Sequence, residues 1–377
     1  MKKIDITYVF GTGRIDKIGK PGFSNEFFYG YDYFSKKKLS LKIIELNEKN
    51  KDRNLTGRFF HFIDRILNKL SKLPFYSSEV TSYRNFKTLL NSTNVIFSND
   101  RIGLSSLFIF SIARLFKKIN TVVIVMGMLN NDGEGKAVVF FRRTILNFFL
   151  SLNNNFIFLG EGEWRDAAIQ FPKFAHKFVF LPFCIDTNFW QSEIKYLSEK
   201  REHILFIGND GNREYEKVIK IAENLPELKF LFVTSNIKDS AIVSENVELI
   251  RGNWNKSILN DGAIKEIYMR SLMTIIPLKN TLQPSGQSVA LQSMSMGTPV
   301  LISDSIGFWD KEKFINEEHL LIIRDNSIEN WIKKINELLA KPDRLQSMSC
   351  KGQSLIQEKY KLDYFDLELE KFLKEVN

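Results

Sequence analysis

The chain has 377 residues, of which 44% are hydrophobic and 33 are Phe, so it can bury a large core and is expected to form two domains of about 180 residues each. The net charge of +9 is uneven, because residues 1–190 hold 28 Lys and Arg against 16 Asp and Glu, whereas residues 191–377 hold 25 against 28. A basic half suits nucleic acid, anionic lipid or an acidic substrate, or is a solvated surface. No nucleic-acid-binding motif accompanies it, so nucleic acid is not expected as a partner.

Cysteine and histidine residues argue against a metal site or a disulfide framework. Cys184 and Cys350 lack metal-ligand spacing, and the four His residues are scattered. The chain starts directly in a strand pattern, and no apolar run reaches the roughly 18 residues that span a bilayer. We therefore expect a cytoplasmic protein without a metal or a transmembrane segment.

The first half alternates apolar strands with helices, which predicts a parallel sheet. Its strands are predicted at residues 4–10, 41–46, 94–97, 121–126 and 156–159. Its helices are predicted at residues 25–36, 103–117 and from 160 onward. The tight turn Gly11-Thr12-Gly13 after the first strand lacks the third glycine of a dinucleotide fingerprint, so it is weak evidence for a cofactor.

Two further segments of the first half, 57–74 and 136–150, combine apolar and basic residues at helical spacing. The basic residues are Arg58, Arg65, Lys69 and Lys72 in the first segment and Arg142 and Arg143 in the second. Such a helix either packs on a core with a solvated basic face or lies on an anionic membrane surface. Both interpretations stay open from the sequence.

The second half follows a polar stretch at residues 191–201 and repeats the alternation. Its strands are predicted at residues 203–208, 228–234, 273–278, 298–303 and 320–323 and within 245–252. Its helices are predicted at residues 263–271, 287–296, 328–339 and 363–376. Alternating strands and helices again predict a parallel sheet.

The stretch 282–303 is the most informative of the chain. Pro284, Ser285 and Gly286 form a turn ahead of a helix at 287–296, and Gly297 suits the residue that ends it. A glycine-containing loop that opens onto a helix N-terminus presents free backbone N–H groups to an anion such as a diphosphate. The alternative is an ordinary βαβ segment in which the glycine only makes a turn.

The residue pattern of this stretch resembles the nucleotide-sugar loop and helix of GT-B glycosyltransferases, specifically those similar to retaining family 4, the group 1 glycosyl transferases. The resemblance rests on Ser285-Gly286-Gln287-Ser288-Val289 and continues through Gly297-Thr298-Pro299-Val300 and Ile306-Gly307-Phe308. Two other passages also look like that family, namely Leu181-Pro182-Phe183-Cys184-Ile185-Asp186, where glycine is usual at position 184, and Gly208 to Tyr215.

The resemblance implies two Rossmann-like α/β domains that face a cleft. We expect an acceptor-binding domain at 1–188, a linker at 189–201 and a nucleotide-sugar domain at 202–357. We also expect a terminal helix within 358–377 that packs back on the first domain. Such enzymes need no metal, because a helix N-terminus and basic side chains stabilise the departing nucleoside diphosphate.

The resemblance also implies the site residues. The cations expected to stabilise the diphosphate are Arg213, Lys217 and Lys279. The donor-binding positions are expected at Gly208, Asn209, Ser285, Gly286, Gln287, Ser288 and Gln292. The acceptor or cleft positions are expected at Gly11, Thr12 and Gly13.

The sequence departs from the family at two positions. The family usually has two glutamates where this chain has Pro284 and Gln292, so the contacts to the donor sugar and the activity itself are in question. Gln292 could still accept a ribose hydroxyl through its amide oxygen. Asp16 and Glu26 are the candidate bases for an inverting alternative, although neither has a motif around it.

These observations predict a metal-independent, hexosyltransferase-like glycosyltransferase that uses no cofactor. It would move a sugar from a nucleotide-sugar donor, with retention, to a polysaccharide or lipid-linked acceptor. Its place would be the cytosolic face of a membrane, which the basic first half could contact. The alternatives are a catalytically inactive relative that binds a nucleotide sugar or a partner transferase, and a GT-B sugar-nucleotide epimerase.

Overall fold

The computed structural model describes residues 3–47, 55–130, 135–192, 201–252 and 259–374, which form two compact α/β units. Unit 1 combines Met1–Lys20, Phe28–Leu181 and Phe365–Asn377. Unit 2 combines Pro21–Phe27 and Pro182–Tyr364. Each unit has its own sheet and its own hydrophobic core.

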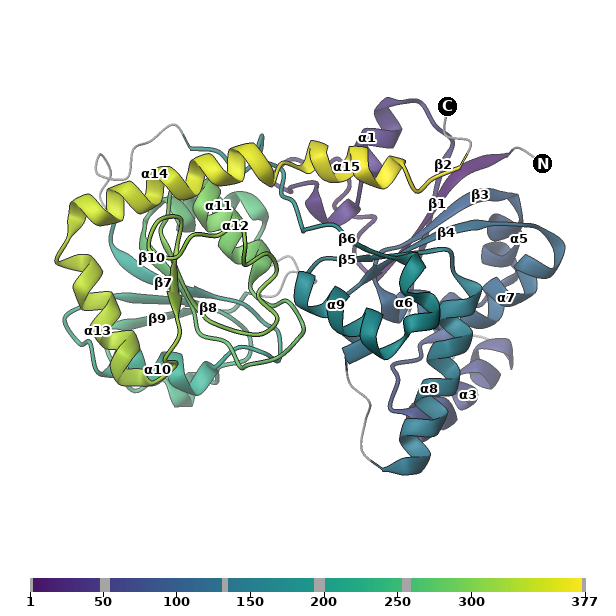
Figure 1. Cartoon of the computed structure of the whole chain (residues 1–377), viewed down its shortest axis with the longest axis horizontal. Helices are drawn as coiled ribbons and strands as arrows, with labels where there is room; N and C mark the ends of the chain where they lie inside the picture. Colours follow the sequence, from purple (N-terminus) through teal and green to yellow (C-terminus); the bar gives the residue numbers. More distant parts are fainter. Residues whose placement is uncertain (1–2, 48–54, 131–134, 193–200, 253–258, 375–377) are drawn as a thin grey trace. The chain divides into compact units, whose positions relative to one another are not determined.

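The sheet of unit 1 has six parallel strands in the order β2-β1-β3-β4-β5-β6 (Figure 1). The strands are β1 Ile4–Phe10, β2 Leu41–Glu45, β3 Ser92–Phe97, β4 Asn120–Val125, β5 Asn155–Phe158 and β6 Phe178–Phe180. Every residue of β4 is buried, as expected for a strand with helices on both faces. The strand order changes direction between β1 and β3, and ligands of open α/β sheets bind beside such a reversal.

The helices of unit 1 pack on this sheet and on one another. They are α1 Tyr31–Lys36, α3 Leu55–Ser71, α4 Ser77–Val80, α5 Tyr83–Asn91, α6 Asp100–Ser105, α7 Leu107–Phe116, α8 Lys136–Leu152 and α9 Glu161–Gln170. Short 3₁₀ turns lie at η1 Glu26–Phe28, which spans the division between the units, and in unit 1 at η2 Met128–Asn130 and η3 Pro172–Lys177.

Two predicted helices of the first half are interrupted. The helix predicted at 25–36 is broken between η1 and α1, where Tyr29 and Gly30 have φ angles of 46° and 79°. A Cβ on Gly30 would lie 2.9 Å from the ring of Phe34, so the close packing of that ring requires glycine. The helix predicted at 103–117 starts at Asp100 and breaks at Ser106, whose hydroxyl donates to the carbonyl of Ile102 at 2.9 Å.

The second basic segment, now α8, does not form the basic outer face that its sequence suggests. Arg142 is buried and donates from Nη2 to the carbonyl of Met128 at 2.6 Å. Arg143 is exposed but donates to the carbonyl of Gln170 at 2.8 Å. Both guanidinium groups therefore bind neighbouring backbone of unit 1.

The sheet of unit 2 also has six parallel strands, in the order β12-β11-β10-β7-β8-β9 (Figure 1). The strands are β7 His203–Ile207, β8 Phe230–Val233, β9 Val247–Ile250, β10 Ser271–Ile276, β11 Val300–Ser303 and β12 Leu321–Ile323. The direction reverses between β7 and β10. The predicted donor residues after position 207 and after position 276 therefore follow two adjacent strands at one edge of the sheet.

The helices of unit 2 are α10 Tyr215–Glu223, α11 Asp261–Met269, α12 Gln287–Ser295, α13 Ile328–Leu339 and α14 Pro342–Lys359, with a 3₁₀ turn η5 Asp239–Ala241. The division between the units falls within α15 Leu362–Glu370. The sequence did not predict α14, because its buried face includes Ser349 and Gly352 among the apolar residues. A Cβ on Gly352 would lie 2.7 Å from the carbonyl oxygen of His319, so α14 packs closely there.

The units differ from the predicted domain boundaries in three places, one of which is that residues 358–364 belong to unit 2. Residues 21–27 join unit 2, where Ser24 donates from its backbone N and its hydroxyl to Asp261, each at 2.8 Å. Residues 182–188 also join unit 2. Residues 193–200 of the predicted linker lie outside the described residues.

The C-terminal segment 365–374 lies with unit 1. Asn94 donates to the carbonyl of Lys374 at 2.8 Å, and Tyr33 donates to Glu370 at 2.7 Å. The helix itself ends at Glu370, earlier than the predicted residue 376.

Candidate functional site

The N-terminus of α12 is the first component of the candidate site. Gly286 is its N-cap with φ of 80°, and no side chain caps the helix. A Cβ at this position would lie 2.8 Å from the Cγ2 of Ile276, so only glycine fits both the backbone angle and the space. The first amides of the helix are therefore not used by a side-chain cap, and the positive end of the helix dipole lies at the carboxyl edge of the sheet.

A short antiparallel contact holds two loops together at this edge. The loop after β7 pairs with the segment after β10, since Lys279 N donates to Asn212 O at 2.9 Å and Glu214 N donates to Pro277 O at 3.0 Å. Arg213 lies opposite Leu278 in this bridge. This backbone pairing fixes the position from which the side chain of Arg213 extends.

Arg213 is the second component, and it is buried, with 3% of its side chain exposed. Its Nε donates to Asp210 at 2.9 Å. A Cβ on Gly208 would lie 2.6 Å from that Nε, and a Cβ on Gly286 would lie 3.2 Å from Nη1. The guanidinium group therefore lies against two glycines, one after each central strand.

Nη1 of Arg213 is buried and has no hydrogen-bond partner among the described residues. Although the guanidinium is paired with Asp210, a buried N–H donor without a partner costs free energy, so an anionic ligand that accepts from Nη1 would be stabilised. The uncapped helix end and the guanidinium together make an electropositive site for a group such as a diphosphate.

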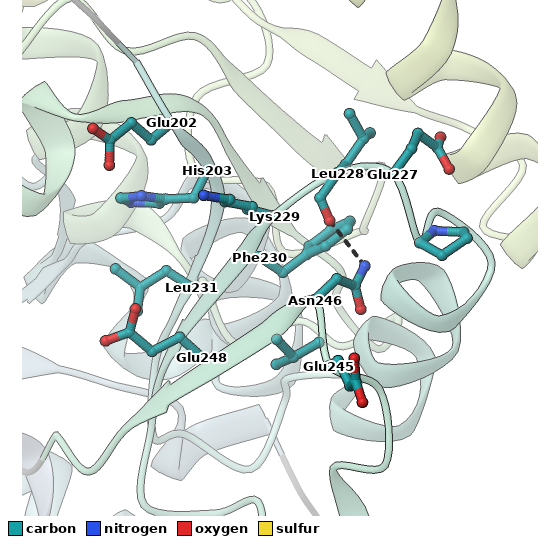
Figure 2. A pocket seen from close by; sticks show the side chains of 12 residues that line it. Glu202, His203, Glu227, Leu228, Lys229, Phe230, Leu231, Glu245, Asn246 and Glu248 are labelled. Atoms are coloured by element: carbon teal, nitrogen blue, oxygen red, sulfur yellow. Dashed lines mark hydrogen bonds between the residues drawn. The ribbon is translucent and has the colours of Figure 1, made fainter.

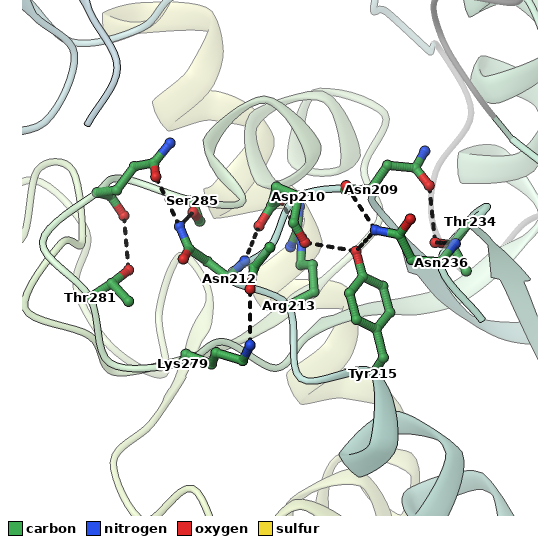
Figure 3. Close-up of polar contacts among 12 residues, drawn as sticks. Asn209, Asp210, Asn212, Arg213, Tyr215, Thr234, Asn236, Lys279, Thr281 and Ser285 are labelled. Carbon is green, nitrogen blue, oxygen red and sulfur yellow. Dashed lines mark hydrogen bonds and ion pairs between the residues drawn. The ribbon is translucent and has the colours of Figure 1, made fainter. Parts of the chain in front are cut away.

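Ser285 holds the glycine turn in place. Its hydroxyl accepts a hydrogen bond from Nδ2 of Asn212 at 2.8 Å, and the same amide group is 3.2 Å from Oε1 of Gln283 (Figure 3). Ser285 and Gln287 are buried, whereas Ser288 is half-buried. The side chain of Ser285 therefore fixes the loop, which leaves the backbone amides as the groups that face an anion.

The two predicted lysines contact the protein in different ways. Lys279 is exposed, and its Nζ donates to the carbonyl of Gly211 at 3.0 Å, so it lies beside the same loop (Figure 3). Lys217 forms an ion pair with Glu214 at 3.2 Å within the first turn of α10. The structure thus brings Lys279 next to the loop that contains Arg213, whereas the charge of Lys217 is paired at the start of its own helix, α10.

Asn209 has a structural task that the sequence did not predict. Its Nδ2 donates to Gly252 O at 2.7 Å, and its Oδ1 accepts from Ser235 N at 2.7 Å and from Thr234 Oγ1 at 3.1 Å. These bonds join the loops that follow β7, β8 and β9, and Figure 3 shows Asn209 beside Thr234. Asn209 therefore positions the neighbouring loops.

Gln292 takes part in a buried network. Its Nε2 donates to Glu26 Oε1 at 2.8 Å, and its Oε1 accepts from the hydroxyl of Tyr268 at 3.2 Å. Trp190 Nε1 also donates to Glu26 Oε1, at 2.8 Å. The amide oxygen that was predicted to accept a ribose hydroxyl is therefore already bonded to Tyr268.

Glu26 is fully buried in this network, and burial raises its pKa to about 7 despite the hydrogen bonds from Gln292 and Trp190. A base in an inverting reaction must reach an acceptor hydroxyl. Glu26 is only 1% exposed and contacts protein groups, which contradicts that role. Asp16, the other candidate base, is exposed in unit 1.

Unit 1 carries a different set of groups at the carboxyl edge of its sheet. Gly11, Thr12 and Gly13 follow β1, and the hydroxyl of Thr12 donates to Leu46 O at 3.0 Å. Asp100, at the end of the loop after β3, is buried and accepts from the backbone N of Met126 and Met128 at 2.9 and 3.0 Å. Burial raises the pKa of Asp100.

Glu163 lies close to Asp100 and is also buried. Its Oε1 accepts from Gly127 N at 2.7 Å, but burial and the negative charge of Asp100 raise its pKa to about 8. The sequence did not single out either carboxyl group, because each lies on the first turn of a helix, where acidic residues are common. Only the tertiary structure shows that both carboxyl groups are buried.

Similarity to known proteins lies in the structure, because no protein-family model and no curated protein sequence matches the chain. HepE of Anabaena, in a complex with UDP and glucose, has a TM-score of 0.66 and 10% identity, covering 99% of this chain and 100% of that one. The sucrose-phosphate synthase of Thermosynechococcus elongatus has a TM-score of 0.68 and 12% identity over 99% of both chains. A glycosyltransferase of Rickettsia africae has a TM-score of 0.66 and 12% identity, covering 100% and 99%.

The chain has the GT-B fold. The prediction of two Rossmann-like α/β domains is therefore confirmed. Within the GT-B fold, Arg213, Gly286 and Lys279 lie at the carboxyl edge of the second sheet, as ligand-binding residues of open α/β sheets do.

A separate hollow of about 520 Å³ lies at the opposite, amino edge of the same GT-B domain (Figure 2). Its lining includes the first residues of three strands, His203, Phe230 and Val247. None of the predicted site residues lines it. Burial lowers the pKa of His203 to about 4, so this imidazole is neutral at physiological pH.

The described residues contain no group of three or more His, Cys, Asp or Glu residues that could hold a metal ion. They also contain no helix with the length and hydrophobicity needed to cross a bilayer. A reaction that needs neither a metal nor a cofactor stays a prediction.

Proposed function

We propose that the protein is a metal-independent glycosyltransferase that moves a sugar from a nucleotide-sugar donor to a polysaccharide or lipid-linked acceptor. The observation that carries this proposal is the buried guanidinium of Arg213, whose Nη1 lacks a partner among the described residues and lies against Gly286 at the uncapped start of α12. A site with a fixed positive charge at a helix N-terminus that no side chain caps suits a diphosphate.

The proposed chemistry places the diphosphate at this site as the leaving group. The bond between the anomeric carbon and the phosphate oxygen breaks, and its electron pair stays on the diphosphate. The acceptor oxygen bonds to the anomeric carbon, and its proton passes to a donor phosphate oxygen, which gives retention without a protein nucleophile. Arg213 and the first amides of α12 stabilise the negative charge that develops on the diphosphate.

UDP is the first nucleoside diphosphate to test, because HepE was crystallised with UDP and with UDP-glucose. The test incubates the protein with a panel of UDP-sugars and GDP-sugars, with and without a membrane extract as the source of acceptor. Release of nucleoside diphosphate that depends on the extract supports transfer. Formation of an isomeric sugar nucleotide without acceptor would instead identify an epimerase.

A second candidate is a catalytically inactive relative that binds a nucleotide sugar or a partner transferase. It is favoured by Pro284 and by the side chain of Gln292, which is bonded to Glu26 and Tyr268. In this case the panel gives binding of a nucleotide sugar without turnover.

The acceptor of the proposed transferase is expected at the cytosolic face of a membrane, where the basic first half of the chain would meet anionic lipid.

A further inference from the structure

The inward face of helix α3 of unit 1 is part polar and part apolar, because Asp64 and Ser71 are buried there and Leu67 packs on the core of the unit. Asp64 is buried and accepts from the backbone N of Ser77 and Ser78, each at 3.0 Å. Asn68 accepts from Phe75 N at 2.7 Å. These bonds use α3 to hold the start of α4 and the chain before it, and they fix which face of α3 is turned inward.

The outward face of α3 is apolar. Its exposed large side chains recur every three or four residues and therefore form one stripe along the helix: Leu55, Phe59, Phe62, Ile66 and Leu70. Phe59 is 59% exposed and Phe62 is 61% exposed. An ordinary amphipathic helix would turn such residues toward the core.

A basic row borders this stripe on one side. Arg58, Arg65 and Lys69 are exposed, and each lies three or four positions from a residue of the stripe, which places it on the adjoining surface of the helix. None of the three forms an ion pair with a described carboxylate, whereas many other exposed cations of the chain do. The outward surface of α3 thus combines apolar anchors with free positive charge.

The neighbouring helix α8 contacts α3 (Figure 1). It exposes Phe140, Phe141 and Phe148 together with Lys136 and Arg143, while its Arg142 is buried. Exposed aromatic and basic side chains therefore occur on both helices.

We infer that the outward surface of α3 docks on an anionic lipid bilayer, with the apolar stripe in the interface and the basic row against the headgroups. A bilayer accounts for both halves of the surface, because apolar side chains enter the acyl boundary and cations pair with anionic headgroups. This inference deepens the proposed function, in that it names the surface that meets a membrane-bound acceptor. It does not depend on the diphosphate site, which lies in unit 2.

The experiment is flotation of the full chain with vesicles of phosphatidylcholine mixed with phosphatidylglycerol, and with vesicles of phosphatidylcholine alone. We expect binding to the mixed vesicles that weakens as salt is raised, since headgroup attraction is screened. The double variant Phe59→Ser with Phe62→Ser should lose about tenfold or more of this partitioning, because two exposed aromatic anchors are removed. The double variant Arg58→Gln with Arg65→Gln should lose binding mainly at low salt.

The matched control is Val243→Ser with Ile315→Ser, which removes two exposed apolar residues from unit 2 and should leave flotation unchanged. Circular dichroism of every variant shows whether the chain is still folded, and UDP binding measured beside it separates failure of docking from failure of the diphosphate site. Equal flotation of the aromatic variant and the wild type overturns the inference. So does a dimer in sedimentation that the aromatic substitutions convert to a monomer, because the stripe would then bind a second copy.

Discussion

The two sheets share one design, six parallel strands with a single reversal of direction, yet they bury different ionisable groups at their carboxyl edges. Unit 2 buries the guanidinium of Arg213 beside the start of α12. Unit 1 buries the carboxyl groups of Asp100 and Glu163 beside the loops after β3 and β4. The shared sheet topology provides a position for a ligand at the carboxyl edge, and the buried side chains determine which ligand can bind there.

The physical cost of burial differs between the two edges. The guanidinium of Arg213 pairs with Asp210 and retains a donor that a diphosphate can satisfy. Glu163 avoids a buried charge by holding its proton, since its pKa is raised to about 8. The edge of unit 2 therefore attracts an anion, whereas the edge of unit 1 holds a neutral carboxylic acid at physiological pH.

The largest expected effect follows from removing the cation of unit 2. Arg213→Ala should lower the rate of sugar transfer by ~10²–10³-fold, because one positioned donor to the developing negative charge is lost. Transfer rates and calorimetric UDP affinity measure the effect. Lys217→Ala is the matched control, since Lys217 pairs with Glu214 on the adjoining helix. Equal losses in both variants would contradict a special role for Arg213.

The next effect concerns the buried acid of unit 1. The pKa of Glu163 in the folded chain, about 8, lies above its usual value of 4.5, so the folded state holds the proton longer than the unfolded state does. The free energy of unfolding should therefore fall as the pH rises from about 5 to about 8, by an amount on the order of 3 kcal/mol. Denaturant unfolding at several pH values measures it.

Glu163→Gln should remove the part of this pH dependence that Glu163 contributes, because the amide does not titrate, whereas the buried Glu26, whose pKa is raised to about 7, keeps its own part. Glu161→Gln is the control on the same helix, where Glu161 pairs with Arg165 at the surface. If the wild type and Glu163→Gln lose stability in parallel over this pH range, the acid of unit 1 is not the neutral group described.

A smaller effect is expected at the glycine that Arg213 lies against. Gly286→Ala should cost about 1 kcal/mol of stability or more, since φ is 80° and the new Cβ would lie 2.8 Å from Ile276. It should also weaken UDP binding, because the Cβ would lie 3.2 Å from Nη1 of Arg213. Gly211→Ala is the control, as no atom lies within 4 Å of its Cβ position. Unchanged UDP affinity in Gly286→Ala would mean that the turn at Gly286 is not part of the UDP site.

The smallest effect is expected at Lys279. Its exposed Nζ donates one hydrogen bond to Gly211 O, and an exposed bond of this kind contributes about 1 kcal/mol or less. Lys279→Ala should therefore weaken UDP binding by less than about tenfold, with the fold retained. A loss as large as that of Arg213→Ala would mean that Lys279 itself contacts the diphosphate.

The sequence by itself determined the two Rossmann-like domains and most of their elements. β1 at Ile4–Phe10 and α13 at Ile328–Leu339 have the predicted bounds, because apolar periodicity is local information. The turn at Gly286 and the start of α12 were also predicted, since glycine and helix-start signals are local as well. What such signals cannot give is the partner of each polar side chain.

The tertiary structure alone decided which side chains are engaged and which face of a helix is turned outward. Gln292 and Asn209 were predicted to bind the donor, but both are bonded to residues that are distant in the sequence. Asp100 and Glu163 became buried only when β3, β4 and β5 came together in one sheet. The pattern of α3 was visible in the sequence, but polar bonds from Asp64 and Asn68 fixed its apolar face outward. Hydrogen-bond partners far apart in the chain set these outcomes, and no local pattern records them.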